Sequence, residues 1–124
     1  MKKSKILIVE DEIIAGMALC TKLDDSGYHV CPIASTGEEA IRIAEEEKPD
    51  LMLMDISIRG EMGGIEAASL IRNRLGVPVI FVTGYPDQVT RNKARIVDPA
   101  AYLVKPLDYE ELLVTIEGVI SPSL

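Results

Sequence analysis

The stretch LMLMDI, residues 51–56, sets four apolar residues directly before an aspartate and decides the fold we expect. A short, continuous apolar run of this kind is typical of a strand buried on both faces of a parallel sheet. Asp55 then lies at the carboxyl end of that strand, on the edge where open α/β sheets bind their ligands. A lone aspartate there could be an ordinary strand terminator, so the other strand ends must decide its role.

The composition indicates one globular, acidic domain. The chain has 124 residues, 48% of them hydrophobic, and a net charge of −7, enough for a single core. This charge disfavours non-specific binding to nucleic acids or anionic membranes, so we expect neither as a direct partner. The two cysteines have no metal or redox spacing, and neither a secretory signal nor a membrane-spanning run of about 18 apolar residues is visible. These features predict a cytoplasmic protein.

Five apolar strands alternate with five helices along the chain. We expect the strands over residues 5–9, 28–34, 50–55, 77–82 and 101–104, the second interrupted by Pro32 and therefore at an edge. We expect the helices over residues 12–26, 36–48, 64–75, 86–97 and 108–120. The first should bury Ala15, Ala18, Leu19 and Leu23, and the fourth, poor in apolar residues, should be weakly held. This alternation predicts an α/β fold, a parallel sheet with helices on both faces.

Charged and hydroxyl side chains follow four of the five strands: Glu10 and Asp11, then Asp55, Thr83 and Lys105. In a doubly wound sheet of order 2-1-3-4-5 these ends lie at one edge. Three carboxylates there repel, by about 4 kcal/mol per pair at about 4 Å and an effective dielectric near 20. One lysine cannot neutralise them, and oxygen ligands indicate Mg²⁺. A carboxylate beside Mg²⁺ can form an aspartyl phosphate, with the hydroxyl and the ammonium stabilising the phosphoryl group.

The whole chain resembles the receiver domain of two-component response regulators, of the chemotaxis-regulator type. Four motifs in the family's order carry the resemblance: KILIVEDE (5–12), LMLMDI (51–56), PVIFVTG (78–84) and AYLVKP (101–106). It implies a flavodoxin-like five-stranded sheet of order 2-1-3-4-5. It also implies a receiver domain over residues 1–120, with a tail or the start of a linker at residues 121–124.

The resemblance implies a role for each residue at the strand ends. Asp55 would be the phosphoacceptor, and Thr83 and Lys105 would hold the phosphoryl group. Tyr102 would be the aromatic residue that changes rotamer with Thr83 on activation. The peptide bond between Lys105 and Pro106 is expected to be cis, which an X–Pro bond permits at low cost.

The resemblance also implies a metal site and one departure from the family. Asp11 would bind Mg²⁺ directly and Glu10 through water, together with Asp55 and the backbone carbonyl of Ser57. Arg59 occupies a position where this type of receiver usually carries a proline, and the loop that follows is one residue longer than usual. We therefore expect the path of residues 57–64 to be non-standard.

The expected function is a phosphorylation-dependent signalling switch. A sensor histidine kinase or phosphotransfer protein would donate to Asp55, and the surface formed by the fourth helix, the fifth strand and the fifth helix would change. The resemblance allows a homodimer through that surface. The protein would promote only its own phosphorylation and dephosphorylation and would not be an enzyme in the usual sense.

Two alternative functions are a degenerate receiver that binds partners without phosphorylation and an aspartyl-nucleophile phosphatase. The intact acids, threonine and lysine argue against the first. The second needs an acid two residues after the nucleophile, where this chain has Ser57. A flavodoxin-like electron carrier is disfavoured because the acids after the first strand would repel a cofactor phosphate.

Overall fold

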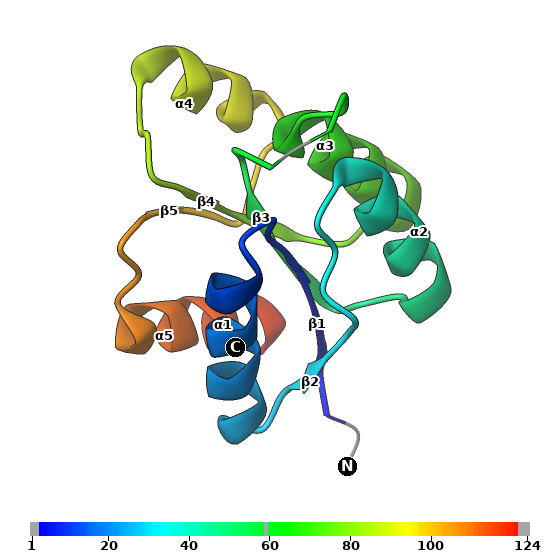
Figure 1. Ribbon diagram of the computed structural model, residues 1–124, viewed down its shortest axis with the longest axis vertical. Coiled ribbons are helices and arrows are strands. Elements are labelled where there is room, and N and C mark those ends of the chain that lie inside the picture. The colour runs from blue at the N-terminus through cyan, green and yellow to red at the C-terminus, as the bar shows by residue number, and fades with distance from the viewer. Residues whose placement is uncertain (1–2, 59, 122–124) are drawn as a thin grey trace.

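The computed structural model describes residues 3–58 and 60–121. Its parallel sheet has the order β2-β1-β3-β4-β5 and consists of β1 (Lys5–Val9), β2 (His29–Val30), β3 (Leu51–Asp55), β4 (Val79–Thr83) and β5 (Ala101–Val104). The helices are α1 (Ile13–Asp25), α2 (Gly37–Glu47), α3 (Gly64–Leu75), α4 (Gln88–Ile96) and α5 (Tyr109–Ile120). The expected fold, strand order and coverage of both faces by helices are confirmed (Figure 1). Within the described ranges, no helix is long and apolar enough to cross a membrane.

The sheet separates two apolar cores, because alternate residues of a strand point to opposite faces. Helices α2, α3 and α4 cover one face, and α1 and α5 cover the other (Figure 1). Strand β3 serves both cores: Met52 and Met54 pack on the first, Leu51 and Leu53 on the second. Burying a side chain of this size stabilises the fold by about 1.5–3 kcal/mol. The run LMLM is therefore continuous rather than alternating, and it holds Asp55 in the middle of the sheet.

Side-chain caps fix the starts of three helices. Thr36 Oγ1 accepts a hydrogen bond from the Glu39 amide at 3.1 Å, which confirms the expected start of α2. Asp108 Oδ1 accepts from the Glu110 amide at 2.9 Å at the start of α5, and Asp87 caps α4. Each such cap stabilises its helix by about 0.5–2 kcal/mol. The caps of α4 and α5 also fix the ends of the loops that leave β4 and β5.

The second strand is much shorter than expected. Of residues 28–34, only His29 and Val30 form a strand, although the amide of Ala34 still donates to the Ile8 carbonyl at 3.0 Å. Pro32 explains the break, because it has no amide hydrogen to continue the ladder. Ala34 forms an isolated bridge with Val9, so the chain returns to the sheet beyond the proline. The edge position of this strand is confirmed.

Helix α1 turns a different face to the sheet from the one expected. Leu19 and Leu23 are buried as predicted, but Ala15 and Ala18 are exposed and Gly16 is buried in their place. The buried stripe still has helical spacing. A Cβ on Gly16 would lie 3.4 Å from the Ile33 side chain, an ordinary packing distance, so this position faces a neighbouring side chain rather than solvent. The two alanines line a cavity instead.

Helix α4 is anchored by few apolar contacts, as expected. Ala94 is its buried residue, whereas Val89 and Ile96 are largely exposed. Few buried apolar contacts are typical of an element that opens or moves at low free-energy cost. The helix is two residues shorter at its start than the expected range, because Asp87 caps it.

Candidate functional site

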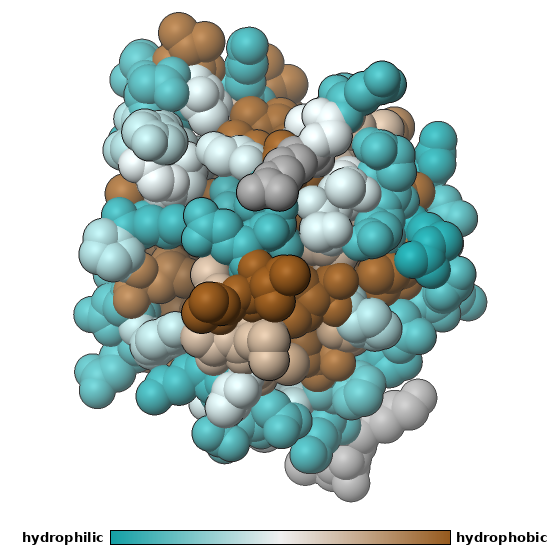
Figure 2. All heavy atoms as spheres, in the orientation of Figure 1, coloured by the Kyte–Doolittle hydropathy of each residue, from teal (hydrophilic) through white to brown (hydrophobic). Residues whose placement is uncertain are grey.

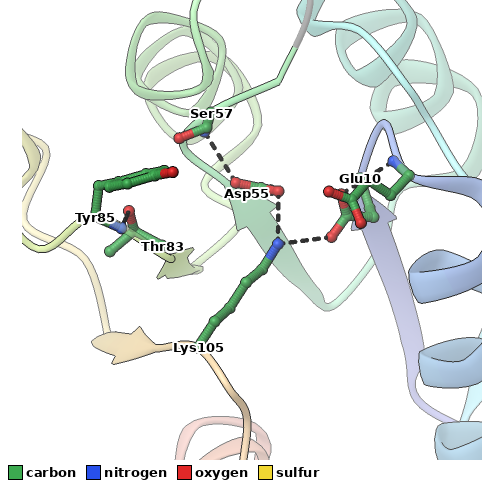
Figure 3. Close-up of polar contacts among 7 residues, drawn as sticks. Glu10, Asp55, Ser57, Thr83, Tyr85 and Lys105 are labelled. Atoms are coloured by element: carbon green, nitrogen blue, oxygen red, sulfur yellow. Dashed lines mark hydrogen bonds and ion pairs between the residues drawn. The ribbon is translucent and has the colours of Figure 1, made fainter.

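The carboxyl ends of β1, β3 and β5 bring Glu10, Asp55 and Lys105 into direct contact (Figure 3). Lys105 Nζ lies 3.0 Å from Asp55 Oδ2 and 3.1 Å from Glu10 Oε1. Asp55 and Glu10 are 6% and 8% exposed, and Lys105 is half-buried. Water screens such pairs less than surface pairs, but the cost of removing the charges from water offsets part of their attraction. The lysine thus links the ends of β1 and β3 to β5.

The buried position of this cluster changes its proton affinities. Burial raises the pKa of Glu10 above its ordinary value of 4.5, although the Glu12 amide and Lys105 favour the carboxylate. For Lys105, burial acts to lower the pKa, but the bonds to Asp55 and Glu10 outweigh it and the pKa is raised. The lysine therefore stays charged, whereas the Glu10 carboxylate is held in a site that disfavours its charge.

Three carboxylates at this edge can meet one cation. Glu10, Asp11 and Asp55 each offer an oxygen, and these oxygens lie within 4.8 Å of one another. At that distance and an effective dielectric near 20, two carboxylates repel by about 3.5 kcal/mol. A donor set of oxygens alone, with room for retained waters, is the kind that Mg²⁺ prefers. The residues present therefore fit Mg²⁺.

Hydrogen bonds orient both oxygens of Asp55. Its Oδ2 accepts from Lys105, and its Oδ1 accepts from the Ser57 backbone amide at 2.9 Å (Figure 3). Metal binding by the Ser57 carbonyl stays a prediction. The departure noted at Arg59 lies outside the described residues.

Gly64 supports the Asp55 backbone, a role that the sequence reasoning missed. A Cβ on Gly64 would lie 2.6 Å from the Asp55 carbonyl oxygen, closer than real side chains approach backbone. The start of α3 can therefore pack against the end of β3 only if residue 64 is glycine. The glycine pair at residues 63 and 64 was the available signal, but it does not tell which of the two touches the strand.

Thr83 and Tyr85 lie on the side of Asp55 away from Glu10 (Figure 3). Thr83 is buried, and its Oγ1 accepts a hydrogen bond from the Tyr85 amide at 3.1 Å. A hollow of about 240 Å³ extends over Asp55 and Lys105, from Asp11 and Glu12 to Tyr85. This hollow gives a small anion a route to the Asp55 carboxylate.

Tyr102 lies on β5 and contacts α4. Its ring is half-buried against the core under α4, and its hydroxyl is buried without a hydrogen-bond partner in the described part of the chain. The Arg91 guanidinium carbon lies 5.1 Å from the ring centroid, a cation–π contact. The expected cis bond between Lys105 and Pro106 is present.

Comparisons with known proteins agree on one family. The family model described as the response regulator receiver domain matches residues 6–117. The transcriptional regulatory protein PdtaR of Mycobacterium tuberculosis is 36% identical over 117 residues, which cover 94% of this chain. The signal receiver domain of a modulated diguanylate cyclase from Desulfovibrio desulfuricans is 36% identical with a TM-score of 0.91, covering 96% of this chain and 94% of that one. A CheY-like receiver domain protein from Methanospirillum hungatei is 30% identical with a TM-score of 0.89, covering 96% and 94%.

Several relatives are longer than this chain, and some are named transcriptional regulators. The chain spans 57% of the length of PdtaR and 38% of the length of the regulator PhyR of Methylorubrum extorquens. Because several relatives are named transcriptional regulators, the expectation that no nucleic acid is a direct partner has no support from these comparisons. The family-model match and the identities above nevertheless establish that the chain belongs to the response regulator receiver domain family.

Proposed function

We propose that Asp55 accepts a phosphoryl group from a sensor histidine kinase or phosphotransfer protein, within a receiver domain over residues 1–120. The main support for this proposal is the buried Asp55 carboxylate, whose Oδ2 lies 3.0 Å from Lys105 Nζ. Carboxylate oxygens of Glu10 and Asp11 lie within 4.8 Å of it. In the transfer, a carboxylate oxygen bonds to phosphorus as the phosphorus–nitrogen bond to the donor histidine breaks. Such a donor makes the cytoplasm the expected compartment.

Each residue of the site has a separate part in that transfer. Glu10, Asp11, Asp55 and the Ser57 carbonyl would hold Mg²⁺, which when bound supplies positive charge to the phosphoryl oxygens. Lys105 already bonds to Asp55 and keeps its proton, so it can follow the new negative charge at the cost of its bond to Glu10. The Ser57 amide keeps the carboxylate oriented while the new bond forms.

The proposed switch runs from Asp55 through Thr83 to Tyr102 and α4. The phosphorylated aspartate draws the Thr83 hydroxyl away from the Tyr85 amide, and Tyr102 follows into the space beside β4. Changing a two-state equilibrium from 1:99 to 99:1 needs about 5.5 kcal/mol, which several charge-assisted hydrogen bonds can provide. The sparse anchoring of α4 supports a change in the α4-β5-α5 surface, where we also place a homodimer contact.

The start of α1 offers the donor an apolar contact. Ile13, Ile14 and Met17 are 76%, 85% and 60% exposed. Figure 2 shows a brown patch over the start of α1, next to the polar edge that holds the site. Exposed apolar clusters of this kind mark protein interaction sites. A partner that covers this patch brings its phosphohistidine to the edge that carries Asp55.

Phosphorylation by a small acyl phosphate tests the proposal directly. We expect incubation with acetyl phosphate and Mg²⁺ to add the mass of one phosphoryl group, lost on hydroxylamine treatment as an acyl phosphate is. Asp55→Asn should stay unmodified, and omission of Mg²⁺ should abolish the reaction. Equal labelling of Asp55→Asn would exclude Asp55 as the acceptor. No labelling of either protein, with retained partner binding, would favour the degenerate receiver, whereas release of phosphate from added phosphomonoesters would favour a phosphatase.

A further inference from the structure

A cavity of about 570 Å³ opens between α1 and α5, beside the carboxyl ends of β1 and β3. Its walls are mostly apolar and include Ile8, Leu19, Leu53, Val82 and Leu107. The volume falls within the range of about 300–1,000 Å³ that is typical of small-molecule sites. In sheets of this strand order, the crevice at the ends of β1 and β3 is where the chain reverses direction and where ligands bind. The cavity therefore has both the size and the position of a ligand site.

Small residues on α1 create this cavity. Ala15 and Ala18 face it, and they are exposed even though their neighbours on the same wall are buried. Helices α1 and α5 lie on the same face of the sheet (Figure 1). A leucine at either alanine would occupy the space between them. The cavity is thus set by the sequence of α1 and can be filled by a single substitution.

The cavity adjoins the hollow where the phosphoryl group would enter. Glu12, Asp55 and Lys105 line both, so the ion pair and the Glu12 side chain form the boundary between them. The phosphoryl side is bounded by residues such as Ser57 and Tyr85, and the new cavity by residues such as Tyr109. A molecule in the cavity would contact the ion pair from behind without blocking the Ser57 side.

The charged groups of the cavity select the class of ligand. Glu10, Glu12 and Asp55 supply three carboxylates against the one ammonium of Lys105. Lys105 is already bonded to Glu10 and Asp55, whereas the Glu12 carboxylate has no hydrogen bond or ion pair within the described residues. An apolar body with one positive charge would satisfy both the walls and this unneutralised carboxylate.

We propose that the cavity binds a small organic cation, with an apolar body between α1 and α5 and one protonated amine directed at Glu12. This binding does not rest on the phosphorylation proposed above, because the apolar walls and Glu12 take no part in phosphoryl transfer. A bound cation would lie against the Asp55–Lys105 pair and would connect a chemical signal to the phosphoacceptor.

Tryptamine is a suitable probe because the chain contains no tryptophan, so all indole emission comes from the ligand. We expect a saturable change in its emission on titration with the protein. Tryptophol, which is neutral, should bind about fivefold more weakly, the factor expected for a partly exposed ion pair. Indole-3-acetate, an anion, should bind more weakly still. Equal binding of the three probes, or no saturable binding of tryptamine, would overturn the proposal.

Three substitutions place the ligand. Ala18→Leu fills the cavity and should abolish tryptamine binding, whereas Thr21→Leu, exposed on the same helix outside the cavity, should leave it unchanged. Glu12→Gln, on the surface, should bring tryptamine down to the affinity of tryptophol while leaving tryptophol unchanged. Thermal unfolding without ligand shows whether each variant is folded. If Ala18→Leu does not fold, Glu12→Gln still tests the proposal. Unchanged tryptamine binding in both Ala18→Leu and Glu12→Gln would refute the site.

Discussion

Replacing Asp55 with asparagine should stabilise the metal-free protein while abolishing phosphorylation. Asp55 is attracted to Lys105 at 3.0 Å, which at an effective dielectric near 20 amounts to about 5.5 kcal/mol. It is repelled by Glu10 and Asp11, whose oxygens lie within 4.8 Å, by about 3.5 kcal/mol each. The repulsions exceed the attraction, and the buried charge adds a desolvation cost. Because Asp11 is partly exposed and more screened, we expect a net gain of about 1 kcal/mol for the neutral side chain.

Urea unfolding at neutral pH, with and without Mg²⁺, measures this effect. Asparagine keeps an oxygen for the Ser57 amide, but its NH2 group replaces the oxygen that accepts from Lys105, so the comparison measures the loss of the charge together with that hydrogen bond. Without Mg²⁺, Asp55→Asn should have the larger free energy of unfolding. With Mg²⁺ at about 100 times its dissociation constant, the wild type should gain about 2.7 kcal/mol and the order should reverse.

Glu61→Gln, an exposed carboxylate in the loop after β3, is the control and should change stability by less than about 0.5 kcal/mol. If Asp55→Asn is instead less stable than the wild type without Mg²⁺, the Lys105 attraction dominates and the electrostatic reasoning is wrong.

Three further predictions follow from individual side chains. Tyr102→Phe removes a buried hydroxyl that has no partner and should raise the free energy of unfolding by about 1 kcal/mol, measured in urea. Gly64→Ala should lower the free energy of unfolding by about 1–3 kcal/mol, because its Cβ would displace the Asp55 backbone, and should weaken Mg²⁺ binding measured by titration calorimetry. Gly63→Ala is the matched control, since its Cβ would meet nothing within 4 Å. The hydrogen bond from the Thr90 amide lowers the pKa of Asp87 below its ordinary value of 3.8. The stabilisation of α4 by the Asp87 cap is therefore present above pH 3.8 and is lost as the pH falls through the lowered pKa. NMR titration of the Asp87 carboxyl carbon measures this pKa.

The sheet and the main site could be predicted because their signals are strong and local. The run LMLM is typical of a strand buried on both faces, and the strand order that the receiver resemblance implied then places Asp55 beside Glu10 and Lys105. Parallel strands end at one edge, so residues far apart in sequence meet without any knowledge of loops. The contacts of Lys105 with both acids are the direct result.

The predictions that were wrong or incomplete concern close packing, which the hydrophobic pattern of a sequence does not encode. In α1, Gly16 is buried while Ala15 and Ala18 are exposed, so the helix is rotated away from the face that its apolar residues indicate. At Gly64 the approach of the chain to the Asp55 carbonyl oxygen excludes a Cβ, and that approach is visible only in three dimensions. Pattern reasoning counts apolar residues, whereas the position of Gly64 is defined by the absence of a side chain.

The orientation of α1 also determines the shape of the crevice beside it. If Ala15 and Ala18 packed on the sheet, as the pattern suggests, α1 would cover the crevice at the ends of β1 and β3. Because Gly16 is buried instead, the alanines border an open cavity whose far wall is the Asp55–Lys105 pair. Asp55 therefore has two approaches, a polar one on the Ser57 side and an apolar one between α1 and α5. A receiver built this way can respond to a phosphodonor through the first and to a small cation through the second, with Lys105 in contact with both.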